Sequence, residues 1–204
     1  MRGEDGTEVT LTILSNQKTS DVTVTRGALD TSAFYEIRKQ GNVSFGYIEL
    51  STFGTDTAKQ VEIALEMFKK KNIQTLVIDL RDNGGGYLTA ATDILDLFFT
   101  SDEVIYQMKE KNSAAKKYYA ESDKKYEFEN GYILVNENTA SASELTAGAL
   151  QSEKGYQLIG KTTYGKGSAQ TQKTLSDGSV LKYTYAKWMI PNGTCINGKG
   201  LTPD

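Results

Sequence analysis

Residues 75–86 read TLVIDLRDNGGG, and they are the clearest indication of how this chain folds. The first six of them are almost continuously apolar, which is typical of a strand buried on both faces of a sheet. A turn with three consecutive glycines follows, and a helical pattern of apolar residues then runs from Leu88 to Phe98. A buried strand that leads through a tight turn into a helix is the unit of layered α/β folds, so we predict that class.

A second stretch repeats this design. Residues 131–136, GYILVN, form another apolar run, and the small residues TASAS follow at 139–143. Residues 144–151 then have a helical pattern. The carboxyl ends of the strands in an α/β sheet are where ligands bind, so these two turns are the first places to look for a site.

The rest of the chain contains both strand-like and helix-like patterns of apolar residues. Further strands are predicted at 7–14, 21–25, 43–50, 156–160, 169–175 and 180–186, and a helix at 55–71. The SDGS sequence at 176–179 predicts a hairpin between the last two strands. Residues 101–130 are charged, rich in tyrosine and weakly periodic. This composition fits an excursion over the site or a lid, and it fits a solvated surface insertion equally well.

We divide the 204 residues into three parts. Residues 1–26 are a small β segment, 27–40 a polar linker and 41–204 the main domain. The polar start and the abrupt end predict a piece of a longer protein, so missing targeting signals say little about the parent protein. No apolar run approaches the roughly 20 residues that span a bilayer.

The composition excludes several classes of protein. The chain has no histidine, which removes Ser-His-Asp and Cys-His triads and most zinc sites, and we expect neither a metal nor a cofactor. The single Cys195 cannot form an intrachain disulfide. The net charge of −3, with lysines and glutamates scattered, predicts no nucleic-acid partner.

The two turns have the residues that an acyl-transfer site needs. A serine at 141, at the start of a helix, has its hydroxyl beside unpaired backbone N–H groups, including that of Ala142. A glycine of the run at 84–86 can bring in a second N–H, and two such donors make an oxyanion hole. When each feature is taken alone, an ordinary turn explains the glycine run equally well, and an ordinary helix cap explains Ser141 equally well.

A serine hydroxyl needs a base, and the chain must supply one other than histidine. Lys166 lies between two glycines in YGKGS, which is typical of a backbone that turns sharply to deliver a side chain. Only about one lysine in a thousand is neutral near pH 7 in water, whereas burial among apolar groups favours the neutral amine. We therefore expect Lys166 to be buried if it acts as the base.

Four segments, taken in order, resemble the C-terminal processing (tail-specific) serine peptidases. They are LRDNGGG at 80–86, TASASEL at 139–145, GKTTYGKGSAQ at 160–170 and PNG…GLTPD at 191–204. Two departures are Gly84, where the family usually has proline, and Thr139, where it more often has serine.

The resemblance implies a role for each residue. Ser141 would be the nucleophile of a Ser-Lys dyad, Lys166 its general base, and Gln170 the side chain that orients the amine. Ala142 and Gly85 would supply the oxyanion donors, although Gly84 and Gly86 remain alternatives to Gly85. The implied activity is a serine endopeptidase that cleaves proteins near unstructured C-termini through an acyl-enzyme.

The resemblance also implies a fold, partners and a location. The fold would be a crotonase-like ββα core. Residues 2–3 and 6–13 resemble the last part of a PDZ domain, so 1–26 would be a partial PDZ-like segment. The substrates would be proteins or peptides with apolar C-termini. The parent protein would be an extracytoplasmic bacterial enzyme of the envelope or periplasm, anchored to the membrane and able to form a homo-oligomer.

Two other classes of function stay open. A catalytically silent peptide-binding scaffold would keep the fold without turnover. A crotonase-type acyl-CoA enzyme is suggested by the fold alone, and the absence of a basic cluster for a nucleotide speaks against it.

Overall fold

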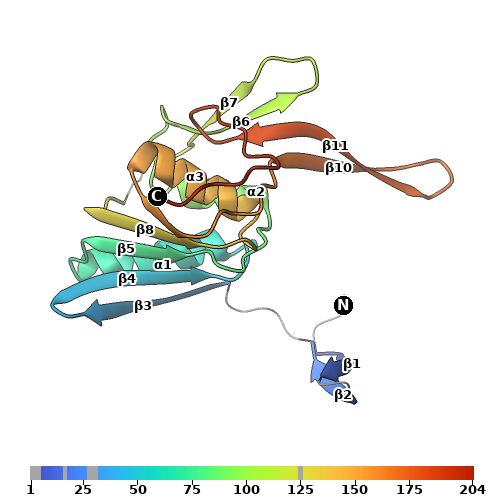
Figure 1. Cartoon of the computed structure of the whole chain (residues 1–204), viewed down its shortest axis with the longest axis horizontal. Helices are drawn as coiled ribbons and strands as arrows, with labels where there is room; N and C mark the ends of the chain where they lie inside the picture. The colour runs from blue at the N-terminus through green and yellow to red at the C-terminus, as the bar shows by residue number, and fades with distance from the viewer. Residues whose placement is uncertain (1–5, 16–17, 27–31, 124–125) are drawn as a thin grey trace. The chain divides into compact units, whose positions relative to one another are not determined.

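A computed structural model describes residues 6–15, 18–26, 32–123 and 126–204. It divides into two compact units, Met1–Thr31 and Ser32–Asp204. The expectations for residues 1–5 of the β segment and for 27–31 of the linker lie outside the described residues. Figure 1 shows the elements along the chain.

The first unit is a two-stranded antiparallel sheet of β1 (Glu8–Ser15) and β2 (Lys18–Thr25). Its register pairs Val9 with Val24 and Leu11 with Val22, so apolar side chains from both strands share one face. Both strands were predicted from their alternation. The likeness of this segment to a PDZ domain stays a prediction.

The second unit is built on a five-stranded sheet in the order β3-β4-β5-β8-β9. The strands are β3 (Ala33–Gln40), β4 (Val43–Leu50), β5 (Thr75–Asp79), β8 (Asn130–Val135) and β9 (Gln157–Gly160). Strands β3 and β4 are antiparallel, and the other neighbours are parallel. The carboxyl ends of β5 and β8 therefore lie side by side, as the two quoted stretches predict.

The structure corrects the extent of the linker. Residues 33–40, which we assigned to it, form β3 and pair with β4 along its whole length. The strand has mostly exposed or half-buried side chains because it is the edge of the sheet, and its sequence is therefore polar.

Three helices form a layer on the five-stranded sheet: α1 (Thr57–Lys70), α2 (Leu88–Leu95) and α3 (Ala142–Lys154). Helix α2 contacts both α1 and α3, while α1 lies against β3 and β4 and α3 lies against β9. Val61, Ala64, Leu65 and Phe68 form the buried face of α1, at the spacing that predicted the helix.

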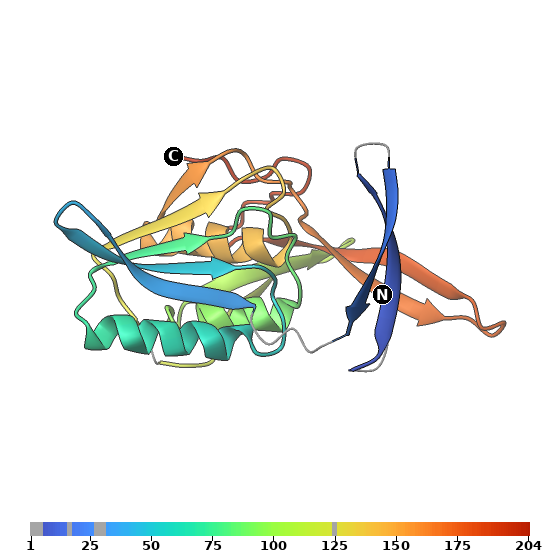
Figure 2. The ribbon, with the colours of Figure 1, turned by 90° about the horizontal axis from the view of Figure 1, so that it is seen from below.

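A second, antiparallel sheet covers the helices in the order β10-β11-β6-β7. Its strands are β6 (Val104–Glu110), β7 (Lys116–Tyr119), β10 (Ser168–Thr174) and β11 (Val180–Met189). Helix α3 contacts β6, and Figure 1 shows α2 and α3 between β8 and this sheet. The predicted hairpin is confirmed, and in Figure 2 its tip extends away from the rest of the second unit.

Part of the stretch at 101–130 is neither a lid nor a loose insertion, because it belongs to this second sheet. It contributes β6 and β7, and Met108 of β6 pairs with Trp188 of β11. The strands were missed because this pairing partner lies far away in the sequence.

The core lies between the layers and fixes their spacing. Phe53, Phe68, Phe98 and Phe99 are fully buried there. Gly46 of β4 permits close packing, because a Cβ at that position would lie 2.5 Å from the ring of Phe68. The α/β class is confirmed. No helix in the described part of the chain is long and apolar enough to cross a bilayer.

Candidate active site

The turns that follow β5 and β8 are joined directly to each other. The N–H of Ala140 donates to the carbonyl of Asn83 at 3.0 Å, and the hydroxyl of Ser143 donates to the same oxygen at 2.9 Å. The Thr139 hydroxyl donates to the carbonyl of Leu80 at 2.8 Å. These buried bonds hold the glycine turn against the segment that contains Ser141.

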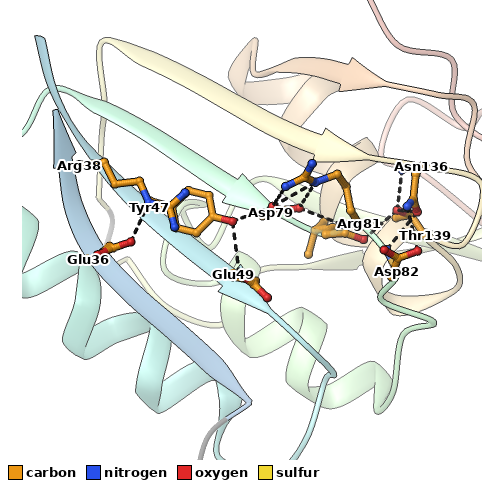
Figure 3. Close-up of polar contacts among 10 residues, drawn as sticks. Glu36, Arg38, Tyr47, Glu49, Asp79, Arg81, Asp82, Asn136 and Thr139 are labelled. Atoms are coloured by element: carbon orange, nitrogen blue, oxygen red, sulfur yellow. Dashed lines mark hydrogen bonds and ion pairs between the residues drawn. The ribbon is translucent and has the colours of Figure 1, made fainter. Parts of the chain in front are cut away.

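Asp82 ties the same two turns together at the surface (Figure 3). Its Oδ1 accepts from Asn136 Nδ2 at 2.9 Å and from Asn138 Nδ2 at 2.8 Å, and its own N–H donates to Asn136 Oδ1 at 3.0 Å. The bonds from Asn138 and Asn136 lower the pKa of Asp82. Asp82 has a positive φ of 60°, a conformation that aspartate tolerates better than most residues.

Asp79 anchors the end of β5, just before the glycine turn (Figure 3). Its buried carboxylate accepts from Arg81 Nε at 2.9 Å and Nη2 at 2.6 Å, and from the Tyr47 hydroxyl at 2.7 Å. Burial raises the pKa of Asp79, but the bonds from Arg81 and Tyr47 outweigh it and the net pKa is lowered. Burial, followed by the bond to Asp79, raises the pKa of Tyr47 to about 12, so the phenol stays a donor.

Ser141 is half-buried and immediately precedes α3. Its backbone has φ 60° and ψ −118°, a sparsely populated conformation for serine that costs of order 1–3 kcal/mol. Gly85 faces it closely: a Cβ at Gly85 would lie 2.8 Å from Ser141 Cβ and 2.9 Å from the nitrogen of Ala142. Only glycine fits there, and its own φ is 98°.

The three glycines are not equivalent as donors. The N–H of Gly85 donates to Asn83 Oδ1 at 2.9 Å, so it is occupied within the turn. Gly86 lies with Ser141 and Ala142 on the wall of one cavity. Among the described residues, the N–H groups of Gly86 and Ala142 have no hydrogen-bond acceptor.

Lys166 lies in the loop between β9 and β10. The loop packs closely on the segment at 197–200: a Cβ at Gly165 would lie 2.8 Å from the nitrogen of Gly200, and one at Gly167 would lie 2.8 Å from that of Asn197. The two glycines are thus required by backbone contact, which agrees with the prediction of a sharp turn.

The side chain of Lys166 lines the same cavity as Ser141. It is exposed rather than buried, which corrects our expectation, because the cavity is open to solvent beside it. Within the described residues, Lys166 Nζ makes no hydrogen bond to Ser141 Oγ. The serine and the amine therefore share a cavity without a hydrogen bond between them among the described contacts.

Gln170 lies on β10 and also lines the cavity. The pairing of β10 with β11 shifts between Ala169 and Gln170, so that Tyr185 is left over on the partner strand. Such a bulge re-aims side chains, and both Gln170 and Tyr185 lie on the cavity wall.

The cavity has a volume of about 550 Å³ and an apolar wall next to its polar one. The apolar wall comes from α2, α3 and the second sheet and consists of Leu88, Met108, Leu145 and Trp188. Among the described residues, no group of three or more His, Cys, Asp or Glu side chains could hold a metal ion.

Sequence reasoning missed Glu144, although a signal was present. A glutamate three residues after a serine at a helix start is the capping-box pattern. The Glu144 side chain is fully buried and accepts from the N–H of Ser141 at 2.8 Å and from that of Lys166 at 2.8 Å. It links the two predicted catalytic segments, which are also joined by the N–H of Tyr164 donating to the carbonyl of Thr139 at 3.0 Å.

A strained serine at the start of a helix, beside backbone N–H groups that have no acceptor among the described residues, is an arrangement that suits a serine peptidase. The chain belongs to peptidase family S41, whose family model matches residues 44–204. This agrees with the resemblance that the four motifs indicated.

Two similar proteins support the assignment to the serine peptidases. The carboxy-terminal processing protease CtpB of Bacillus subtilis (strain 168) is 37% identical over the whole chain, which covers 43% of that protein. A probable CtpA-like serine protease of Staphylococcus haemolyticus (strain JCSC1435) is 34% identical, again over the whole chain, which covers 41% of it. The chain therefore spans less than half the length of either relative.

A solved structure shares the fold. The photosystem II D1 C-terminal processing protease superposes with a TM-score of 0.75 at 27% identity. The match covers 99% of this chain and 56% of that one.

Proposed function

We propose that this chain is the catalytic part of a serine endopeptidase that cleaves protein substrates near unstructured C-termini. The observation that carries the proposal is the strained Ser141 at the start of α3, on one cavity wall with Lys166. The chain has no histidine, so a lysine of this cavity is the candidate base for the serine. Lys182 also lines the cavity, but Lys166 is the lysine whose backbone Glu144 joins to that of Ser141.

The proposed reaction has two stages. The neutral amine of Lys166 takes the proton of Ser141 as Oγ attacks the scissile carbonyl, and it then gives that proton to the leaving amine. This leaves an acyl-enzyme on Ser141. A water molecule gives a proton to the same amine as it attacks the ester. The amine returns that proton to Ser141 Oγ as the acyl group leaves, which releases the product and regenerates the enzyme.

The oxyanion donors in this proposal are Ala142 and Gly86. Both residues line the cavity, and their N–H groups have no acceptor among the described residues, whereas the N–H of Gly85 already donates to Asn83 Oδ1. Gly86 therefore takes the role that the sequence assigned to Gly85, and Gly85 provides the space for Ser141. Losing one such donor typically raises the barrier by about 3–4 kcal/mol.

The amine of Lys166 must move to act. Lysine has a flexible four-carbon stem. We therefore propose that the Lys166 side chain rotates to bring its amine to Ser141 Oγ while the backbone of the loop stays in place. A substrate chain that fills the cavity displaces water from around the amine. The carboxamide of Gln170, from the same wall, would then orient the amine.

The apolar wall favours substrates with apolar residues at the cleaved end. Leu145 and Trp188 offer contact area, and burying one aliphatic side chain there contributes about 1.5–3 kcal/mol. From the family likeness we also propose an extracytoplasmic, membrane-anchored parent protein that forms homo-oligomers and recruits substrates through a PDZ domain completed outside residues 1–26.

The test is turnover of casein, an unfolded protein substrate, by wild type, Ser141→Ala and Lys166→Ala. We expect both variants to lose at least about a hundredfold in activity. Lys161→Ala is the matched control, because Lys161 is a nearby exposed lysine that pairs with Glu137. Equal activity in all four proteins contradicts the proposal.

A second function is favoured by one observation: within the described residues, no hydrogen bond joins the Lys166 amine to Ser141 Oγ, although both line one cavity. A silent peptide-binding scaffold would retain this arrangement permanently. It predicts that peptides with apolar C-termini bind without being cleaved on long incubation, and that a fluorophosphonate does not label Ser141.

A further inference from the structure

Glu144 is a buried carboxylate at the junction of three segments. Its side chain is fully inaccessible to solvent. Oε2 accepts from the N–H groups of Ser141 and Lys166, both at 2.8 Å. Oε1 accepts from the N–H of Gly165 and from the hydroxyl of Thr163, both at 2.6 Å.

All four partners are donors, so the carboxylate acts only as an acceptor. A buried carboxylate is costly unless hydrogen bonds satisfy its oxygens, and here each oxygen has two. Such bonds to a charged group contribute more than neutral ones. The contact therefore holds the segments together firmly.

We propose that Glu144 is a positioning residue that sets the separation between the nucleophile segment and the base segment. This rests on the proposed roles of Ser141 and Lys166. One oxygen atom binds the backbone nitrogens of both residues, so the two nitrogens lie within twice 2.8 Å of each other. A shift of about 1 Å between catalytic groups can cost about a hundredfold in rate.

Thr163 extends the contact to the end of the domain. Its hydroxyl donates to Glu144 and accepts from the N–H of Leu201 at 2.7 Å, while its own N–H donates to the carbonyl of Leu201 at 3.1 Å. The base segment is thus held between Glu144 on one side and the segment at 196–201 on the other.

A helix cap alone would need only the bond from Ser141. The other three donors come from residues 163–166, which lie 19 to 22 positions along the chain and belong to a different segment. A cap therefore predicts a loss of stability alone, whereas the positioning role predicts a loss of turnover in the folded enzyme.

The test compares Glu144→Gln, Thr163→Val and Thr163→Ser with wild type and with the control Glu137→Gln, an exposed glutamate on the neighbouring turn. Glutamine keeps the shape but places donors against N–H groups. We measure kcat, KM, the fluorophosphonate labelling rate of the folded fraction, and the melting temperature.

We expect Glu144→Gln to lower kcat and the labelling rate about a hundredfold with KM within about twofold. Thr163→Val should lower both by about tenfold, and Thr163→Ser should restore them, because serine returns the hydroxyl. Glu137→Gln should match wild type. If Glu144→Gln does not fold, the same measurements on Thr163→Val and Thr163→Ser test the positioning role.

The inference is overturned if folded Glu144→Gln labels at the wild-type rate, or, where that variant does not fold, if folded Thr163→Val does. It is also overturned if activity falls only in proportion to the unfolded fraction. In both cases Ser141→Ala and Lys166→Ala would still be inactive, so the proposed function would stand. Retained activity in those two variants would instead remove the proposed function itself.

Discussion

At the scale of single residues, the site depends on backbone positions that exclude side chains. Gly85 lies so close to Ser141 that even one methyl group would collide with it. Gly84, the preceding residue, faces open space. The same glycine-to-alanine substitution can therefore be made at both positions, and only at Gly85 does the added methyl group meet neighbouring atoms.

We predict that Gly85→Ala lowers the rate of Ser141 labelling by about a hundredfold, because the added Cβ displaces Ser141 and the nearby N–H of Ala142. Overpacking should also destabilise the fold by about 1–3 kcal/mol. Labelling kinetics and urea unfolding measure the two effects. Gly84→Ala is the control and should stay close to wild type; equal behaviour of both variants would contradict the assigned geometry.

The sequence located Ser141, Ala142, Lys166 and Gln170, and the structure brings all four to one cavity. Sequence motifs could do this because each motif keeps its residues close together in the chain. They could not identify the free glycine N–H, which depends on the side chain of Asn83. Nor could they reveal the exposure of Lys166, which depends on how the cavity opens.

At the scale of elements, an ion pair between Asp79 and Arg81 fixes the end of β5. Asp79 is only 3% exposed and binds Arg81 through two side-chain nitrogens. Its pKa is lowered in the folded protein, so the folded state binds a proton less readily than the unfolded chain. The stabilisation is therefore present above the ordinary aspartate pKa of about 3.9 and is lost as pH falls through the lower, folded value.

We predict that Asp79→Asn lowers the free energy of unfolding by about 1–3 kcal/mol at pH 7. The gap between wild type and variant should narrow below about pH 4, as the wild-type carboxylate is protonated. Melting temperatures from pH 7 to pH 2.5 measure this. Asp93→Asn, on the exposed side of α2, is the control. A gap that stays constant across the range would contradict the argument.

The elements that the sequence predicted best are those with strong local patterns. Strands β4, β5 and β8 appeared as apolar runs because they lie inside the sheet. Strand β3 was assigned to a linker because an edge strand is largely exposed. Strands β6 and β7 were missed because they are stabilised by pairing that begins at β11, more than 70 residues away.

At the scale of the whole molecule, every described residue of the proposed site lies in the second unit, Ser32–Asp204. The first unit is a two-stranded sheet, which is marginally stable by itself. The proposed chemistry therefore needs only the second unit, whatever the first unit contributes to recruiting a substrate.

We predict that a protein of residues 32–204 melts within a few degrees of the full chain. The part that is removed is a separate two-stranded sheet, and such a sheet has little stability of its own. Ser141 labelling should stay within about twofold, since the hydrogen bonds that Glu144 and Asn83 accept from the N–H groups of Ser141 and Ala140 are retained. Calorimetry and labelling measure this. A labelling rate that falls tenfold or more would show that residues 1–31 take part in assembling the site.

The most direct measurement of the central claim is the site and rate of fluorophosphonate labelling, followed by mass spectrometry. The account predicts one adduct, on Ser141, that forms at least about a hundredfold more slowly in Lys166→Ala and at the wild-type rate in Lys161→Ala. An adduct on another residue, or an undiminished rate in Lys166→Ala, would contradict it.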